Sequence, residues 1–167
     1  MPIPRSVEKF LGDQHVAYSV LHHPAAYTAQ EEASVAHVPG RQWAKTVACF
    51  ADERPILAVV PAPSVVDLGR LREIPGAKKI RLARERDFED LYPDCEIGAM
   101  PPLGPLYGQQ VFVDQTLAAA GEIVFEAGSH TDAVRVKYDD FVQAVRPTAG
   151  DFGRARRAVQ DVIRGNP

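Results

Sequence analysis

The hydrophobic and polar positions of this chain change period over short distances, so they predict short elements of both kinds. Apolar residues at helical spacing predict a first helix that begins with Ser6 as its N-cap and ends near Gly12. Residues 18–23 have the composition of a strand, which Pro24 stops. A helix and a strand are therefore expected to open the chain.

A second helix is predicted from a polar start signal. Thr28 and Glu31 form the pattern of a capping box, in which a hydroxyl and a carboxylate satisfy free amides at a helix start. Pro39 and Gly40 end this helix.

Two apolar runs predict a hairpin at the centre of the sheet. Residues 45–50 and 56–60 are strand-like, and the turn residues 52–55 connect them. Residues 65–73 then have a helical pattern. The remaining predicted elements are a strand at 79–83, a short helix at 84–91, strands at 111–113, 122–125 and 133–136, and a helix at 138–145.

The pattern changes at about Pro147, where Gly, Pro and Arg replace the strand-like runs. One apolar helical stripe can be drawn through Phe152, Ala155, Val159 and Ile163. We therefore predict one domain over 1–147 and a C-terminal tail or helix over 148–167. Short strands among short helices predict an α/β (α+β) fold with a mixed, largely antiparallel sheet flanked by helices.

Length and charge narrow the functional classes. The 167 residues suffice for one well-packed domain, and the formal net charge of −3 gives no basic field for binding extended duplex DNA or RNA. A local positive cluster could still hold one phosphate-bearing end. Cys49 and Cys95 lie far apart and outside any metal-ligand or redox motif, so we expect reduced, packed thiols and no metal.

The chain shows no targeting segment. Its first residues do not resemble a signal peptide, and no apolar run approaches membrane-spanning length. We therefore expect a cytoplasmic protein with neither a membrane nor DNA as a partner.

Three segments carry the candidate chemistry. The loop 98–106 is dense in Gly and Pro, which makes it rigid and lets its backbone approach a ligand closely. Lys45 opens an apolar strand, and the turn 127–130, Ala-Gly-Ser-His, follows another.

Each segment also has an ordinary structural explanation. An isolated strand lysine more often extends to solvent than binds a ligand. Gly and Pro occur in many surface loops. A lone histidine is more often exposed or hydrogen-bonded than catalytic, and Thr28 could be a helix cap alone.

In their order and spacing, the three segments resemble the YbaK and prolyl-tRNA synthetase-associated editing-domain family. The resemblance covers about residues 3–146. Members of this family hydrolyse amino acids wrongly esterified to tRNA. The resemblance implies a free-standing aminoacyl-tRNA deacylase with a central, partly barrel-like sheet flanked by helices.

The resemblance assigns roles to the matched positions. Lys45 would hold the phosphate or backbone of the terminal adenosine, a role that suits a compact cation. The segment from Gly98 to Pro102 matches the family's G-x-x-x-P loop, whose backbone groups would bind the ester carbonyl and the amino group. His130 would lie at the substrate pocket. The other candidate substrate-binding residues are Tyr27, Thr28, Thr46, Met100, Pro101, Pro102, Gly128 and Ser129.

The amino acid that is removed stays open. Thr46 departs from the asparagine that often follows the lysine in the alanine-editing branch, and it matches the Lys-Thr of branches that remove cysteine and other small residues. Alanine, serine, threonine, cysteine and 2-aminobutyrate are all candidates, with tRNAPro as the expected carrier. The expected partners are the acceptor end of an aminoacylated tRNA and, as a second candidate, prolyl-tRNA synthetase.

The mechanism needs little chemical machinery. An aminoacyl ester is already activated, so orienting a water and stabilising the oxyanion suffice, with a substrate hydroxyl or a loop group placing the water. The chain has no G-x-S-x-G, H-E-x-x-H, P-loop or G-x-G-x-x-G motif. We therefore expect no cofactor, no metal and no covalent nucleophile. The alternative is a binding or regulatory module that kept the fold and pocket without turnover.

Overall fold

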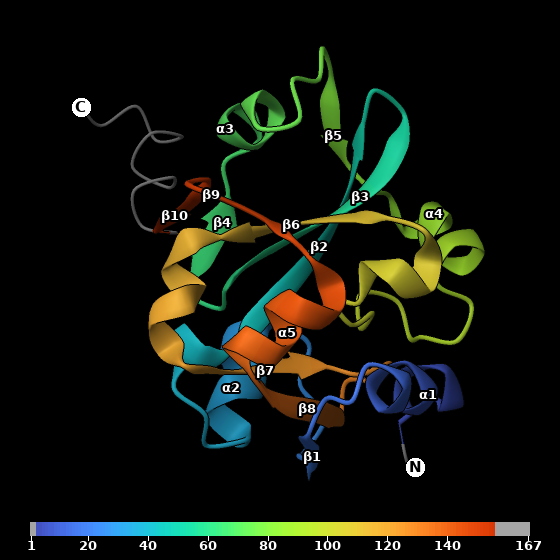
Figure 1. Ribbon diagram of the computed structural model, residues 1–167, viewed down its shortest axis with the longest axis vertical. Helices are drawn as coiled ribbons and strands as arrows, with labels where there is room; N and C mark the ends of the chain where they lie inside the picture. The colour runs from blue at the N-terminus through green and yellow to red at the C-terminus, as the bar shows by residue number, and fades with distance from the viewer. Residues whose placement is uncertain (1–2, 156–167) are drawn as a thin grey trace.

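The computed structural model describes residues 3–155 as three β-sheets with short helices packed around them (Figure 1). The helices are α1 (Arg5–Asp13), α2 (Ala29–Val35), α3 (Leu68–Glu73), α4 (Glu85–Leu91) and α5 (Tyr138–Val145), with 3-10 turns at η1 (Gly40–Gln42), η2 (Gly104–Tyr107) and η3 (Gln115–Ala120). The strands are β1 (Tyr18–His22), β2 (Ala44–Ala51), β3 (Arg54–Pro61), β4 (Ser64–Val66), β5 (Ile80–Leu82), β6 (Gln110–Asp114), β7 (Glu122–Glu126), β8 (Asp132–Lys137), β9 (Thr148–Gly150) and β10 (Gly153–Ala155).

The largest sheet has the strand order β5-β2-β3-β6-β9. β2 and β3 form an antiparallel hairpin in which Lys45 lies opposite Val60. β3 pairs with β6, and β6 with β9, in parallel. The predicted central position of the hairpin is confirmed, because β3 is the middle strand and β2 lies beside it.

Two smaller sheets complete the fold. β1, β8 and β7 form an antiparallel sheet, and β10 pairs with β4. An isolated bridge between Trp43 and Val124 joins the chain just before β2 to β7. The mixed, mostly antiparallel architecture is confirmed. The predicted barrel-like character is not confirmed, since none of the three sheets in residues 3–155 closes on itself.

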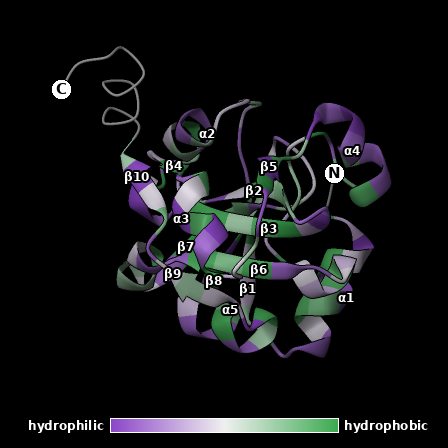
Figure 2. Ribbon diagram, turned by 90° about the horizontal axis from the view of Figure 1, so that it is seen from above, coloured by the Kyte–Doolittle hydropathy of each residue, from purple (hydrophilic) through white to green (hydrophobic). Residues whose placement is uncertain are grey.

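The core has apolar layers on both faces of β3. Leu57 and Val59 face one buried cluster, whereas Ala58 and Val60 face another. Because both faces are covered, this strand reads as a continuous apolar run rather than an alternating one. Figure 2 shows hydrophobic residues along β6 and much of β3, while the peripheral helix α4 is largely hydrophilic.

Most predicted elements are confirmed. Thr28 caps α2 and its side chain accepts a hydrogen bond from the Glu31 backbone N–H at 3.1 Å. The predicted helices at 84–91 and 138–145 and the strands at 18–23, 79–83, 111–113, 122–125 and 133–136 all occur, within one or two residues at their ends. No helix in residues 3–155 is long and apolar enough to cross a membrane.

Three predicted element boundaries were wrong. Helix α2 ends at Val35, before Pro39 and Gly40, because His37 has a positive φ of 58° that stops the helix. The N-cap of α1 is Pro4 and not Ser6, because the Pro4 carbonyl already accepts hydrogen bonds from Val7 and Glu8. The predicted helix 65–73 begins only at Leu68, since the Asp67 side chain caps it, and the residues before Asp67 form β4.

The predicted C-terminal helical stripe was wrong in its first half. Phe152 is fully buried in the core and Ala155 lies in β10, which pairs with β4. The buried carboxylate of Asp114 explains this, because its Oδ1 accepts the backbone N–H groups of Phe152 (3.2 Å) and Gly153 (2.7 Å). Val159 and Ile163 lie outside the described residues. The domain boundary at 147 stays a prediction.

Candidate active site

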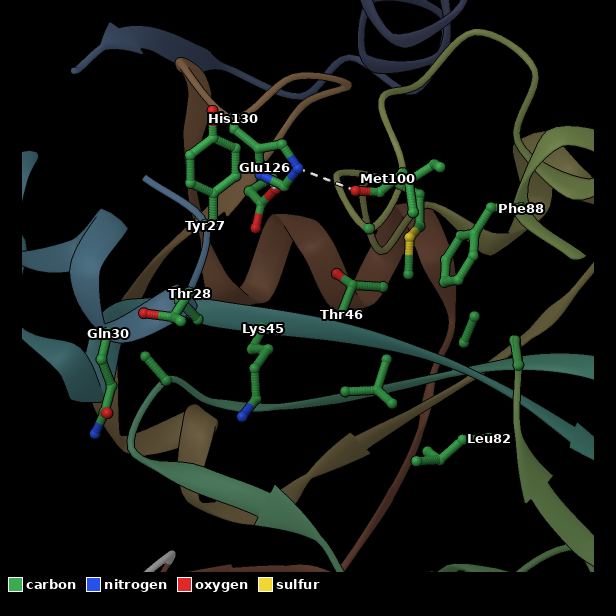
Figure 3. Close-up of a pocket in the computed structure, with 17 residues that line it drawn as sticks. Tyr27, Thr28, Gln30, Lys45, Thr46, Leu82, Phe88, Met100, Glu126 and His130 are labelled. Carbon is green, nitrogen blue, oxygen red and sulfur yellow. Dashed lines mark hydrogen bonds and ion pairs between the residues drawn. The ribbon is translucent and has the colours of Figure 1, made fainter. Parts of the chain in front are cut away.

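A cavity of about 500 Å³ opens beside the start of β2 (Figure 3). The N-terminal end of α2, the loop after α4 and the end of β7 contribute its other walls. Its lining residues are Tyr27, Thr28, Ala29, Gln30, Lys45, Thr46, Val47, Ala48, Ala62, Leu82, Ala83, Phe88, Ile97, Gly98, Met100, Glu126 and His130. Most of the candidate residues from the sequence therefore meet in one place, although they come from distant segments.

Lys45 provides a cation at one end of the cavity. The lysine is half-buried, and its side chain points away from Glu126 and His130 (Figure 3). Its Nζ donates a hydrogen bond to the backbone carbonyl of Ser64 in β4, at 2.5 Å. This hydrogen bond fixes the ammonium at the cavity wall, and a compact cation in that position suits an anionic ligand.

The backbone around Gly98 forms another wall. Gly98 has φ +83°, a conformation that costs an L-residue energy, and a Cβ added there would meet no atom within 4 Å. The loop is joined to the turn 127–130 by two backbone hydrogen bonds, from Glu96 N–H to the Gly128 carbonyl (2.8 Å) and from Gly128 N–H to the Ala99 carbonyl (2.9 Å). The backbone at Gly98 is therefore fixed and open to the cavity.

The mouth of the cavity is apolar. Tyr27, Leu82 and Ile97 line it with 77%, 51% and 49% of their surface exposed. They account for most of the exposed large hydrophobic side chains in residues 3–155. Such a concentration of uncovered apolar surface at one opening is typical of a binding site.

The other end of the cavity holds two carboxyl groups around one imidazole. His130 Nδ1 lies 3.3 Å from Glu32 Oε1 and 3.3 Å from Glu126 Oε2. Its Nε2 lies 3.0 Å from the Ile97 carbonyl, next to Gly98. The side chain of Glu32 is 1% exposed, and those of Glu126 and His130 are 13% and 14% exposed. We call Glu32, Glu126 and His130 the carboxylate cluster.

The three groups of this cluster change one another's protonation. Burial, followed by the negative charge of Glu126, raises the pKa of Glu32 to about 9. The hydrogen bond with Glu126 raises the pKa of His130 to about 9, although burial acts in the opposite direction. At neutral pH Glu32 therefore carries a proton, and the imidazole of His130 carries another.

The carboxylate cluster could also hold a cation. Among the described residues it is the one group of three His, Cys, Asp or Glu side chains suited to a metal ion, with ligand atoms all within 4.8 Å of one another. Imidazole and carboxylate ligands are compatible with several divalent metals. The expected absence of a metal stays a prediction.

Sequence reasoning missed Glu32 and Glu126. Glu32 lies on α2, where an acidic residue in the first turn is ordinary, and Glu126 ends β7 as a polar strand terminus would. Only the spacing of Glu126 and His130 around the turn could have drawn attention to them. Phe88 and Leu82, which also line the cavity, were predicted only as parts of a helix and a strand.

Four candidate residues do not line this cavity. Pro101 and Pro102 are buried elsewhere in the loop. Gly128 has φ +103°, and a Cβ there would lie 2.8 Å from Pro4 Cγ, so close packing against the N-terminus requires glycine. Ser129 Oγ donates a hydrogen bond to Asp132 Oδ2 at 2.7 Å. The last two residues face a second hollow beside α1.

Several solved structures share this fold. A hypothetical protein matches with a TM-score of 0.80 and 18% identity, over 90% of this chain and all of its own. A protein described as a candidate trans-editing enzyme for prolyl-tRNA synthetase matches with a TM-score of 0.77 and 22% identity, over 90% of this chain and 96% of its own. A larger protein from Marinobacter aquaeolei VT8, described as a candidate signal transduction protein, matches with a TM-score of 0.72 and 18% identity, over 98% of this chain and 36% of its own.

Sequence comparison identifies the family. No curated protein matches the chain. The sequence pattern of the aminoacyl-tRNA editing domain matches residues 23–144. This range includes every residue that lines the cavity, from Tyr27 to His130. This chain belongs to the aminoacyl-tRNA editing domain family.

Proposed function

We propose that this protein is a trans-editing aminoacyl-tRNA deacylase that hydrolyses the ester of a small mischarged amino acid on tRNA. The observation that carries the proposal is the meeting, in one cavity, of a fixed cation, an open glycine backbone and an apolar mouth, in a chain of the editing-domain family. The candidates are alanine, serine, threonine, cysteine and 2-aminobutyrate. The expected carrier is tRNAPro, in line with the description of one structural relative.

The tRNA end would lie across the cavity mouth. The ammonium of Lys45 would bind a phosphate or sugar oxygen of the terminal adenosine. Tyr27 offers an exposed aromatic ring on which the adenine could stack, and Leu82 and Ile97 add aliphatic surface at the cavity mouth. The ester would then enter between these two contacts.

The fixed backbone at Gly98 would bind the ester carbonyl. Preorganised backbone groups stabilise the charge that develops on an oxygen without reorganisation during the reaction. The φ of +83° at this position is what favours glycine there.

His130 would act as a positioning residue. Its Nδ1 faces two carboxyl groups and its Nε2 faces the Ile97 carbonyl, so both ring nitrogens are occupied when the ring is protonated. A protonated imidazole cannot accept a proton from water. We therefore propose that a substrate hydroxyl orients the water, while His130 fixes the loop beside Gly98.

The test uses tRNAPro charged with each candidate amino acid or with proline. Purified wild-type protein should release one or more small amino acids and leave prolyl-tRNA intact. Lys45→Ala should reduce release by at least about tenfold, the value of one charged hydrogen bond. Lys137→Ala, at an exposed lysine at the end of β8 outside the cavity, is the matched control and should behave as wild type.

Each failure has a distinct meaning. Binding of aminoacyl-tRNA without release of any amino acid would replace the deacylase with the binding module. Equal activity of wild type and Lys45→Ala, with both folded by circular dichroism, would remove Lys45 from the mechanism. Addition of prolyl-tRNA synthetase to the same assay tests the second expected partner.

A further inference from the structure

The carboxylate cluster has one negative charge more than its own imidazole can balance. Glu32 and Glu126 both approach His130 Nδ1 to 3.3 Å, and one imidazolium compensates one carboxylate. The second carboxylate is buried: Glu32 Oε2 has almost no exposed surface, and no N–H group in residues 3–155 donates a hydrogen bond to it. An isolated buried carboxylate is strongly unfavourable, so the cluster needs one further positive charge or a proton.

A proton supplies that charge when the cavity holds no ligand. The raised pKa of Glu32 describes this proton, and burial together with the neighbouring Glu126 is its cause. A ligand cation that reached the cluster would do the same for both carboxyl groups. One cation from a ligand could thus take the place of that proton in the charge balance of the cluster.

The cavity gives a ligand access to this place through Glu126. Glu126 and His130 line the cavity, whereas Glu32 lies behind them. Figure 3 shows a carboxylate oxygen of Glu126 that points away from the His130 ring toward the middle of the cavity. This oxygen can therefore meet a ligand while the other stays beside the imidazole.

We propose that Glu126, supported by Glu32 and His130, binds the α-ammonium group of the aminoacyl moiety and makes the site selective for esters with a free amino group. This inference rests on the proposed deacylase function. An ammonium carries the single positive charge that the cluster requires, and its three N–H donors suit carboxylate acceptors. The backbone of the Gly98 loop then has only the ester carbonyl to bind.

The two ends of the cavity would orient the substrate by charge. Lys45 is positive and points away from the cluster, which attracts positive charge (Figure 3). The end of an aminoacyl-tRNA has the complementary order, with phosphate on one side of the ester and ammonium on the other. Complementary charges at both ends fix the direction in which a ligand binds.

The experiment compares two substrates of equal size that differ in this one group. The first is tRNA charged with the small amino acid that the wild type removes fastest, and the second carries the matching 2-hydroxy acid. The ratio of their kcat/KM values, each corrected for spontaneous hydrolysis, is measured for wild type, Glu126→Gln and Glu122→Gln. Glu122 is the control, because it lies on the same strand, is 54% exposed and is remote from the cavity lining.

Glu126→Gln should reduce the preference for the amino substrate by about tenfold or more, as expected for one charged hydrogen bond, and Glu122→Gln should leave it unchanged. Retained hydrolysis of the hydroxy substrate by Glu126→Gln shows that the cavity is folded. An unchanged ratio in Glu126→Gln would overturn the proposal. So would a preference that EDTA abolishes and a divalent metal restores, since a metal would then occupy the cluster.

A binding measurement separates this inference from the proposed function. Non-hydrolysable 3′-amido analogues of adenosine, one aminoacylated and one with the 2-hydroxy acyl group, are titrated calorimetrically into wild type and Glu126→Gln. Tighter binding of the amino analogue that is lost in Glu126→Gln supports the inference, even if the wild type releases nothing from tRNA. Equal binding of both analogues to the wild type would overturn it, even if deacylation is observed.

Discussion

The two ends of the cavity are built in different ways. At the lysine end, one side chain of β2 reaches one backbone carbonyl, that of Ser64. At the other end, α2, the end of β7 and the turn 127–130 each contribute one group, and Glu32 is 98 residues away from His130 in sequence. The first end is a single charge on a strand, whereas the second is a buried network whose members set one another's protonation.

The two ends should therefore differ in how much they contribute to substrate binding and to the stability of the fold. Lys45 is only half-buried at the cavity wall, so its removal should disturb the fold less than removal of a buried group. Removing one member of the carboxylate cluster changes the charge balance of the other two. We therefore expect substitutions at Lys45 to act mainly on the substrate, and substitutions in the cluster to act on both the substrate and the stability of the fold.

The largest effect is expected when both ends are removed together. Lys45→Ala and Glu126→Gln should each lower kcat/KM by about tenfold to a hundredfold, the range for charged hydrogen bonds. If the two side chains hold different parts of the substrate, their free energies should add in the double variant, within roughly 0.5 kcal/mol. Steady-state deacylation by all four proteins measures this. A double variant no worse than either single one would mean that the two ends act as one unit.

Substitutions at two glycines compare a residue that lines the cavity, Gly98, with one that packs against the N-terminus, Gly128. Gly128→Ala should destabilise the fold by on the order of 3 kcal/mol, because its φ is +103° and its Cβ would lie 2.8 Å from Pro4 Cγ. Gly98→Ala should cost about 1–2 kcal/mol, since only its φ of +83° is unfavourable. Denaturant unfolding gives both values.

The order should reverse for activity. Deacylation per folded molecule should fall more in Gly98→Ala than in Gly128→Ala, because Gly98 lines the cavity and Gly128 does not. Greater loss of activity in Gly128→Ala at a temperature where both are folded would contradict the assignment of the two glycines.

The carboxylate cluster should make stability depend on pH. The folded protein holds protons on Glu32 and His130 up to about pH 9, whereas their ordinary pKa values are 4.5 and 6.5. Between pH 6.5 and 9 the folded state therefore binds more protons than the unfolded state, so stability falls as the pH rises. The Tm should therefore fall as the pH rises from 6.5 to 9, and thermal unfolding at several pH values in this range measures the fall.

Glu32→Gln tests the origin of this slope. The amide keeps the shape of the side chain and removes one of the two titrating groups, so the fall in Tm between pH 6.5 and 9 should become smaller. Glu122→Gln, at an exposed position, should keep the wild-type slope. An equal slope in Glu32→Gln and wild type would place the pH dependence outside the cluster.

The smallest effect is expected at the cavity mouth. Tyr27→Ala removes a stacking surface that is 77% exposed, so KM should rise by about fivefold, near the lower limit for base stacking, with kcat little changed. Tyr18→Ala is the control, because this tyrosine on β1 is also exposed but does not line the cavity. Equal KM values for the two variants would remove Tyr27 from the binding of the tRNA end.

The sequence predicted those parts of the fold that depend on local signals. The cap at Thr28, the hairpin around residues 52–55 and the helix 138–145 follow from side-chain chemistry within a few residues, and all three occur. The C-terminal helical stripe failed because Asp114, about forty residues earlier, fixes the backbone of Phe152 and Gly153. Local periodicity contains no information about such a distant acceptor.

The same division applies to the candidate site. Lys45, Gly98 and His130 could be singled out from the sequence, because the order and spacing of their three segments resemble the editing-domain family, although each segment alone has an ordinary structural explanation. Only the tertiary structure showed that these residues share a cavity with Glu32 and Glu126. Burial and mutual charge give the two glutamates their special character, and both arise only when α2, β7 and the turn 127–130 pack together.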